Sequence, residues 1–346
     1  MRFVLGILAL FSSLWLANCA LVAAPPAQPV AGTLYVVNED SDTLSVIDTA
    51  SDMVVATVPT GRVPHGIAVS PDGKLVYVTL GGEDQVAVLD VATNQVVGAM
   101  PTGKDPQAIA VTRDGRQGYV TNYESHDVTV LDLQARKPLA TIAVGTNPQA
   151  IALSSNGSLV YVVNLRSNSV TVIDAATGKV KSTIPAGEGP CGIALTADGK
   201  YAYVGGHGAS GGMAAAKGMH GTDNKEGAPK MGPNKDVRVL DLEANQIAGT
   251  ISCGIMPVAM ALSPDARAFI VNHGSHELSV VDLGSGNVIA TVPVGKNPFG
   301  IALARDGRQV YVTNRDSHEV SVIDAGSLKV TATIPVGQGP RGLALK

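Results

Sequence analysis

The sequence predicts an all-β fold, a closed β-propeller of seven four-stranded blades. An aromatic residue recurs at intervals of 42 positions, as between Tyr35 and Tyr77, with one longer step of 66 between Tyr203 and Phe269, and an Asp recurs later in each copy. A Pro follows each of these Asp residues by 16 positions, as Pro64 follows Asp48. Repeats of about 40–45 residues with four strands each are typical of propeller blades. The aromatic positions are Tyr35, Tyr77, Tyr119, Tyr161, Tyr203, Phe269 and Tyr311.

The first residues have the features of an export signal. Arg2 precedes an apolar run over residues 3–16, which is shorter than the ~20 residues of a membrane span. We therefore expect a signal peptide over 1–24, a Pro-rich linker over 25–31 and the propeller over 32–346. The protein would be exported to the periplasm or cell envelope of a bacterium.

Two routes of signal processing are open. Residues 16–19 read Leu-Ala-Asn-Cys and resemble a bacterial lipobox, in which Cys19 would carry a lipid, although Asn18 departs from the usual small residue. Ordinary signal-peptidase cleavage between Ala20 and Ala24 is the alternative. Contact with a membrane is expected only through such a lipid.

Four strands are expected in the repeat that begins at Gly145, over residues 149–153, 159–164, 169–173 and 180–185. Gly145 and Pro148 suit the turn before the first strand, because Gly permits unusual φ values and Pro needs no backbone donor. The middle strands are rich in β-branched residues, which fit a pleated surface packed on both sides. Asp174 can accept backbone N–H groups in the following turn.

The two ends of the repeat array predict how the ring closes. The chain finishes on a first strand at 342–346 and begins on a second strand at 32–35. Pairing these segments in one composite blade would remove two exposed sheet edges. The loops between the second and third strands, and between one blade and the next, would then share the face opposite the termini.

The repeat resembles the YVTN-type β-propeller family, which includes YncE-like exported proteins. Residues 119–122 and 311–314 read Tyr-Val-Thr-Asn, and residues 35–38, 161–164 and 269–272 are close variants. The resemblance covers 32–346 and implies a propeller fold. The family includes proteins of many roles, so the function must be argued from the site.

Composition excludes several classes of function. The formal net charge is −4, so no basic field favours nucleic acid. The sequence contains no Cys-x-x-Cys-His motif for covalent haem, no phosphate-binding loop between a strand and a helix, and no nucleophile elbow. We expect a monomer.

The residue after each repeat Pro is expected to rim the channel. A propeller-type lactonase would need carboxylates around a hard cation, and this set contains no acid. His65 and Arg341 would lie on neighbouring blades, where they either bind an anion or solvate the channel mouth, and the second interpretation is favoured. The set is His65, Gln107, Gln149, Cys191, Val258, Phe299 and Arg341.

A second set recurs in the loop after the second strand and contains three His residues. Either it binds a metal or its side chains cap tight turns, and turn capping is favoured because metal ligands must converge to ~2 Å of one ion. The set is Asp42, Asp84, His126, Asn168, His276 and His318.

One repeat carries an insert at about 205–235 that is rich in Gly, Met and His. Imidazole and thioether ligands would suit copper. The alternatives are a flexible flap and a lid or partner-docking loop, and the last is favoured. The candidate ligands are His207, Met213, Met219, His220 and Met231.

Cys191 and Cys253 belong to the innermost and outermost strands of the same blade. Three strand spacings of ~4.8 Å exceed the ~7 Å that a disulfide can bridge, so two separate thiols are expected.

Three functions are compatible with these patterns. The favoured one is a non-catalytic scaffold that binds a protein partner or small ligand on the loop face. The alternatives are a periplasmic redox or metal-handling accessory with a copper loop, and a propeller-type lactonase or other hydrolase.

Overall fold

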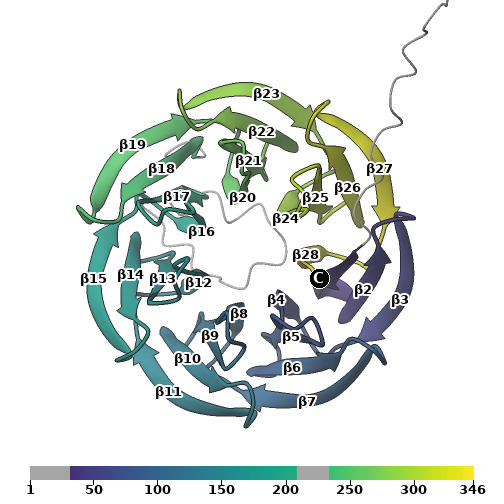
Figure 1. Ribbon diagram of the computed structural model, residues 1–346, viewed down its shortest axis with the longest axis vertical. Helices are drawn as coiled ribbons and strands as arrows, with labels where there is room; N and C mark the ends of the chain where they lie inside the picture. Colours follow the sequence, from purple (N-terminus) through teal and green to yellow (C-terminus); the bar gives the residue numbers. More distant parts are fainter. Residues whose placement is uncertain (1–31, 209–233) are drawn as a thin grey trace, which may run out of the picture.

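The computed structural model describes residues 32–208 and 234–346 of the chain. They form seven four-stranded antiparallel sheets arranged as blades around one central channel (Figure 1). A short 3-10 turn, η1 (Glu39–Ser41), is the one helical segment within the described residues. The predicted seven-bladed propeller is confirmed.

The strands form four concentric rings. The innermost strands are β4 (Pro64–Val69), β8 (Pro106–Val111), β12 (Pro148–Leu153), β16 (Pro190–Leu195), β20 (Pro257–Leu262), β24 (Pro298–Leu303) and β28 (Pro340–Leu345). The second strands are β1 (Thr33–Asn38), β5 (Leu75–Leu80), β9 (Gln117–Asn122), β13 (Leu159–Asn164), β17 (Tyr201–Gly206), β21 (Arg267–Asn272) and β25 (Gln309–Asn314). The third strands are β2 (Thr43–Asp48), β6 (Gln85–Asp90), β10 (Asp127–Asp132), β14 (Ser169–Asp174), β18 (Asp236–Asp241), β22 (Glu277–Asp282) and β26 (Glu319–Asp324). The outermost strands are β3 (Met53–Pro59), β7 (Gln95–Pro101), β11 (Lys137–Ala143), β15 (Lys179–Pro185), β19 (Gln246–Ser252), β23 (Asn287–Pro293) and β27 (Lys329–Pro335).

The ring closes through one composite blade, as predicted. The C-terminal strand β28 pairs antiparallel with β1, with Leu345 opposite Leu34 and Leu343 opposite Val36. The strand order of this blade is β28-β1-β2-β3. This pairing removes two free sheet edges and fixes the last blade against the first.

The core lies between neighbouring blades. Successive side chains of a strand point to opposite faces of its sheet. On β1, Tyr35 packs with Val76 and Val78 of the next blade, while Leu34 packs with Tyr311 of the preceding one. The middle strands are therefore buried on both faces, which explains their nearly continuous runs of β-branched residues.

Two residues of the repeat signature fix the blades through hydrogen bonds. The Thr313 hydroxyl accepts the N–H of Gly300 at 2.8 Å and donates to the Arg341 carbonyl of the next blade at 2.8 Å. The Asn122 amide donates to Thr129 on the neighbouring strand at 2.8 Å. The Thr links adjacent blades, and the Asn orders the turn inside one blade.

The His and Asp residues of the loops after the second strands cap turns. The Nδ1 atoms of His126, His276 and His318 accept backbone N–H groups of the following blade at 3.1–3.2 Å. Asp42 and Asp84 accept equivalent N–H groups through their carboxylates, and Asn168 does so through its amide oxygen. The turn-capping interpretation of this set is confirmed.

Cys191 and Cys253 are both free thiols, as predicted. Cys191 is buried on β16, and Cys253 follows β19 directly. Within 32–208 and 234–346, no helix has the length and apolarity needed to cross a membrane.

Candidate functional site at the channel mouth

A ring of seven residues surrounds the channel mouth, one directly after the second strand of each blade. The backbone N–H of each donates to the carbonyl of the residue before a repeat Pro, as Glu39 does to Gly339 and His207 does to Gly189, both at 2.9 Å. The recurrence of this bond makes the seven positions equivalent. The mouth ring is Glu39, Gly81, Tyr123, Leu165, His207, His273 and Arg315.

The residues predicted to rim the channel do come together, on the innermost strands and therefore inside the mouth ring. All seven post-Pro residues line a cavity of about 310 Å³ at the centre of the propeller. This volume is at the lower end of the ~300–1,000 Å³ typical of small-molecule pockets. Most of the remaining lining is small or aliphatic, so the polar groups of the cavity come largely from the post-Pro positions.

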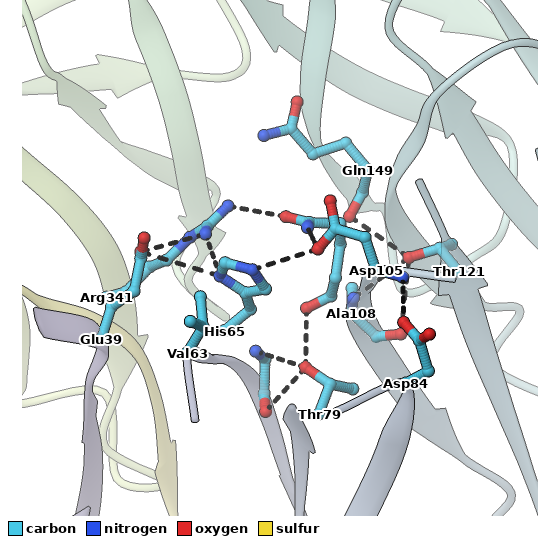
Figure 2. A network of polar contacts seen from close by, with 12 residues as sticks. Glu39, Val63, His65, Thr79, Asp84, Asp105, Ala108, Thr121, Gln149 and Arg341 are labelled. Atoms are coloured by element: carbon cyan, nitrogen blue, oxygen red, sulfur yellow. Dashed lines mark hydrogen bonds and ion pairs between the residues drawn. The ribbon is translucent and has the colours of Figure 1, made fainter. Parts of the chain in front are cut away.

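Arg341 is the centre of a buried polar network on one side of the channel (Figure 2). Its guanidinium donates to Glu39 Oε2 at 3.1 Å and to Gln107 Oε1 at 2.8 Å, and it also donates to His65 Nδ1. Glu39 and Arg341 are only 6% and 8% exposed. The charge of Arg341 is thus matched by a carboxylate inside the protein.

His65 uses both of its ring nitrogens within this network. Because Nδ1 accepts from Arg341, the ring proton of the neutral imidazole resides on Nε2, which lies 3.3 Å from Asp105 Oδ1. Asp105 also accepts from Gln107 Nε2 at 2.7 Å. Nδ1 is thus engaged by Arg341, whereas Nε2 faces the Asp105 carboxylate without a hydrogen bond.

Glu39 also joins the mouth ring to the preceding blade. Its Oε2 lies 2.6 Å from Arg315 Nη1, and the other nitrogen of that guanidinium contacts Asp40 at 2.9 Å. Burial alone would raise the pKa of Glu39, but Arg341, His65 and Arg315 together lower it well below its usual range. Glu39 is therefore an anion at neutral pH.

These contacts correct two expectations. The channel mouth does contain acids, because Glu39 and Asp105 converge on it from positions outside the post-Pro set. His65 and Arg341 do not solvate an open mouth, since both are buried and engaged with protein partners. Nor does Arg341 offer a free charge to an anion, because Glu39 neutralises it.

The opposite side of the channel is apolar. Leu165, Cys191 and Val258 are buried in one cluster there. Phe299 lies on the blade between Val258 and Arg341, and its ring centroid is 5.0 Å from the Arg341 guanidinium. Burial raises the pKa of the Cys191 thiol to about 12. The thiol is therefore protonated at neutral pH and is not a nucleophile.

Two histidines of the mouth ring lie on neighbouring blades, after β17 and β21. His273 is 5% exposed, and its Nδ1–H donates to the Pro298 carbonyl at 3.1 Å, which leaves Nε2 unprotonated. The ring packs edge-on against Phe299, with 6.0 Å between ring centroids. Burial lowers the pKa of His273.

His207 is more deeply buried and is 2% exposed. Neither of its ring nitrogens has a hydrogen-bond partner among the described residues. Burial, and then the charges of His273 and Arg341, lower the pKa of His207 to about 4, so the ring is neutral at neutral pH. Sequence reasoning placed His207 in the insert and missed His273 altogether.

The predicted lipidation site and the remaining predicted metal ligands fall on parts of the sequence that the structure does not describe. Cys19, Met213, Met219, His220 and Met231 lie outside the described residues. Between β17 and β18, the described chain ends at Gly208 and resumes at Asn234, whose N–H lies 3.4 Å from the His207 carbonyl. The described parts of the chain hold no group of three or more His, Cys, Asp or Glu side chains arranged for a metal ion.

Comparisons with known proteins agree on the propeller fold. A family model described as YNCE-like beta-propeller matches residues 234–345, and one described as cytochrome D1 heme domain matches residues 31–152. Each spans about a third of the chain. No curated protein sequence matches it.

Three solved structures are similar over most of the chain. The hydrazine synthase of Kuenenia stuttgartiensis is 22% identical, with 84% of this chain and 92% of that chain covered and a TM-score of 0.73. A functionally unknown protein from Desulfotomaculum acetoxidans is 16% identical, with 90% and 98% covered and a TM-score of 0.74. The dihydro-heme d1 dehydrogenase NirN, in complex with DHE, is 18% identical, with 92% and 77% covered and a TM-score of 0.64. At these identities the likeness shows a shared fold.

Proposed function

We propose that this chain is an exported ligand-binding β-propeller of the YVTN type, which binds its ligand at the channel mouth and serves a redox- or haem-related process. The observation that carries the proposal is the division of the mouth into two walls. One wall is a polar network with matched charges, and the other is apolar and bears two imidazoles. Ligand pockets typically combine a mainly apolar surface with a few precisely positioned polar groups.

The geometry supports binding over catalysis. A general base needs a free lone pair within reach of substrate, but both His65 nitrogens face protein groups. Glu39 is held as an anion between two guanidinium groups, and the Cys191 thiol stays protonated. The lactonase alternative therefore has little support in the described residues.

The redox part of the proposal comes from the match to the cytochrome D1 heme domain model. That match covers 31–152, which includes the segments that supply Glu39, His65 and Asp105 to the mouth. A protein of related fold, NirN, was solved with DHE bound. A shared fold alone does not determine the function, which depends on whether the residues of the mouth fit a haem.

The mouth fits a haem only in part. His273 Nε2 is an unprotonated imidazole nitrogen of the kind that binds haem iron, and Val258 and Phe299 provide apolar surface. However, Arg341 and Arg315 are both paired with Glu39, so neither is free for the carboxylates of a haem. When bound, such a group would supply one-electron redox chemistry.

Native mass spectrometry of the protein isolated from its own envelope tests the binding proposal. We expect a non-covalent ligand mass on the wild type that is lost in Val258→Trp, which fills the mouth. Val97→Trp, on the exposed outer strand β7, is the matched control and should keep the ligand. Equal adducts on both variants, or turnover of simple lactones by the wild type, would contradict the proposal.

A titration with haemin tests the haem candidate. The Soret band should shift at one equivalent for the wild type and for His276→Ala, whose imidazole caps a turn. His273→Ala should lose the shift. An identical shift in all three proteins would show that haemin associates elsewhere.

A copper-handling accessory is the second candidate. It is favoured by the Met and His residues of the insert, which lie outside the described residues, so it depends on the sequence alone. Stoichiometric copper in the purified protein that disappears on deleting residues 209–233 would support it. Copper that survives the deletion would contradict it.

A further inference from the structure

We propose that His207 and His273 form a two-imidazole site for one late transition-metal ion, of the Zn²⁺ or copper class, which links two neighbouring blades at the channel mouth. This inference rests on the proposal that the mouth is the binding site, and it names the chemistry of the ligand. Imidazole suits both metals.

The positions of the two histidines are equivalent to those of a pair already in contact. His207 N and His273 N donate to the carbonyls of Gly189 and Met256, each at 2.9 Å. Glu39 and Arg315 make the same bonds, at 2.9 and 3.0 Å, on the composite blade and on the blade before it. The repeat therefore gives both pairs about the same backbone separation.

The Arg315–Glu39 pair shows that side chains at this separation can meet across the mouth. Their charged ends lie 2.6 Å apart. Two imidazoles are shorter than an Arg and a Glu and would leave a gap between their nitrogens. A metal ion fills such a gap, because each metal–nitrogen bond adds about 2 Å.

His273 already has the local geometry of a metal ligand. Metal-bound imidazoles usually donate their second N–H to a carbonyl or carboxylate, which fixes the tautomer and the ring plane. His273 makes this bond to Pro298 at 3.1 Å, and Phe299 supports the ring. Its Nε2 therefore has an available lone pair.

His207 supplies the independent observation that something binds here. It is 2% exposed, and both of its nitrogens lack a hydrogen-bond partner within the described residues. A buried polar group without a partner destabilises a protein. A metal ion would satisfy one nitrogen directly.

Two imidazoles leave coordination positions open. Structural zinc sites are closed by four protein ligands, whereas sites that act on a ligand keep a position for water or for that ligand. The open positions would explain how a mouth without a free charge captures a ligand. Arg341 adds no free positive charge beside the two imidazoles, because it is paired with Glu39, so an anionic ligand in the open positions would offset the charge of the metal.

Metal titration of the purified mature chain tests the site. Zn²⁺ is added in competition with a chromophoric chelator, and Co²⁺ is added to read the ligand field by absorption. We expect one tight site in the wild type and a loss of at least about 100-fold in affinity in His207→Ala and in His273→Ala, since even outer-shell changes cost 10–100-fold. A metal-induced rise in melting temperature is the second readout and should vanish in the same variants.

Matched controls separate this site from other histidines and from the insert. His126→Ala and His318→Ala remove imidazoles that cap turns, and both should bind as the wild type does. Deletion of 209–233 should also preserve binding. His207→Asn replaces His207→Ala if the latter does not fold.

Two results would overturn the inference. One is the absence of a tight site in the folded wild type, and the other is a site that persists in folded His273→Ala or disappears with the insert. A mouth ligand detected by native mass spectrometry without any metal would leave the proposed function standing while this inference fails. If neither a metal nor another ligand binds at the mouth, the proposed function fails as well.

Discussion

At the scale of single residues, Glu39 is the carboxylate that links three blades at the mouth. It pairs with Arg341 on its own blade and with Arg315 on the preceding blade, and it lies 3.7 Å from His65 on the next. Removing one partner of a buried ion pair leaves the other charge uncompensated. Glu39 therefore stabilises the fold and also neutralises positive charge at the site.

Glu39→Gln should lower the free energy of unfolding by about 3–5 kcal/mol, because the buried Arg341 guanidinium loses its carboxylate and the partly buried Arg315 keeps only Asp40. Urea unfolding followed by circular dichroism measures the change. Asp40→Asn is the matched control, since the Asp40 side chain is half exposed and its ion pair is with Arg315. It should change stability by less than about 1 kcal/mol. Equal effects of the two variants would contradict the network.

The ion pairs of Glu39 also predict that the stability of the protein depends on pH. The pKa of Glu39 is lowered in the folded state from its ordinary value of 4.5, so its stabilising contribution is present above about pH 4.5 and is lost as the pH falls below it. The difference in stability between wild type and Glu39→Gln should therefore shrink on acidification from pH 7 to pH 3. A difference that stays constant over this range would contradict the assigned ion pairs.

The Cys191 thiol should resist modification. Its pKa of about 12 leaves almost no thiolate at pH 8. Mass spectrometry after iodoacetamide treatment should find Cys191 unmodified in the native protein and fully alkylated in urea. Rapid native alkylation would mean that the apolar wall is open to solvent.

At the scale of strands and turns, a Thr in the second strand joins its blade to the next where the repeat carries one, at Thr79, Thr121 and Thr313. Thr313 is fully buried and makes one hydrogen bond within its blade and one across the gap. Thr79 makes the equivalent pair with Gly66 and Gln107, at 2.7 and 3.0 Å. The Thr of the Tyr-Val-Thr-Asn signature therefore stabilises the contact between neighbouring blades.

Thr313→Val should destabilise the propeller by about 1–3 kcal/mol, because the Gly300 N–H and the Arg341 carbonyl lose a buried partner. Chemical denaturation measures the loss. Thr141→Val, on the exposed outer strand β11, is the control and should be nearly neutral. Similar changes at both sites would argue against the inter-blade role.

The sequence predicted the elements well and the mouth only partly. Strand positions, the caps at His126 and Asp84, and the post-Pro ring follow from one repeat, because each depends on backbone geometry that the repeat sets. Glu39 and His273 were missed because only two positions per repeat were considered. The residue after each second strand recurs with the same spacing, so this signal was available. No such signal predicts the pairing of Arg341 with Glu39, because that pairing depends on side-chain directions where β28 meets β1.

At the scale of the whole molecule, the closure between β28 and β1 holds the site together. Arg341 enters the network from β28, and Glu39 follows β1. The same two strands close the ring, so both the closed fold and the charged wall depend on the pairing of β28 with β1. The apolar wall with His207 and His273 lies on blades away from this pairing, as Figure 1 shows for β16 to β23.

Deleting residues 340–346 should lower the melting temperature sharply and promote oligomers, because β1 becomes an exposed edge. Size-exclusion chromatography and thermal melting measure both effects. Deletion of 209–233 is the comparison, since the flanking residues His207 and Asn234 are adjacent and loop length changes entropy only slowly. A monomer with unchanged melting after loss of the last strand would contradict closure by β28.

The central claim is that this propeller binds its ligand at the channel mouth, and a crystal structure of the protein isolated from its own envelope tests it most directly. We predict density other than ordered water at the centre of the mouth ring, in contact with Phe299 and within about 2 Å of a nitrogen of His207 or His273 where a metal is present. A mouth that holds only water, together with a ligand bound on another surface, would contradict the account.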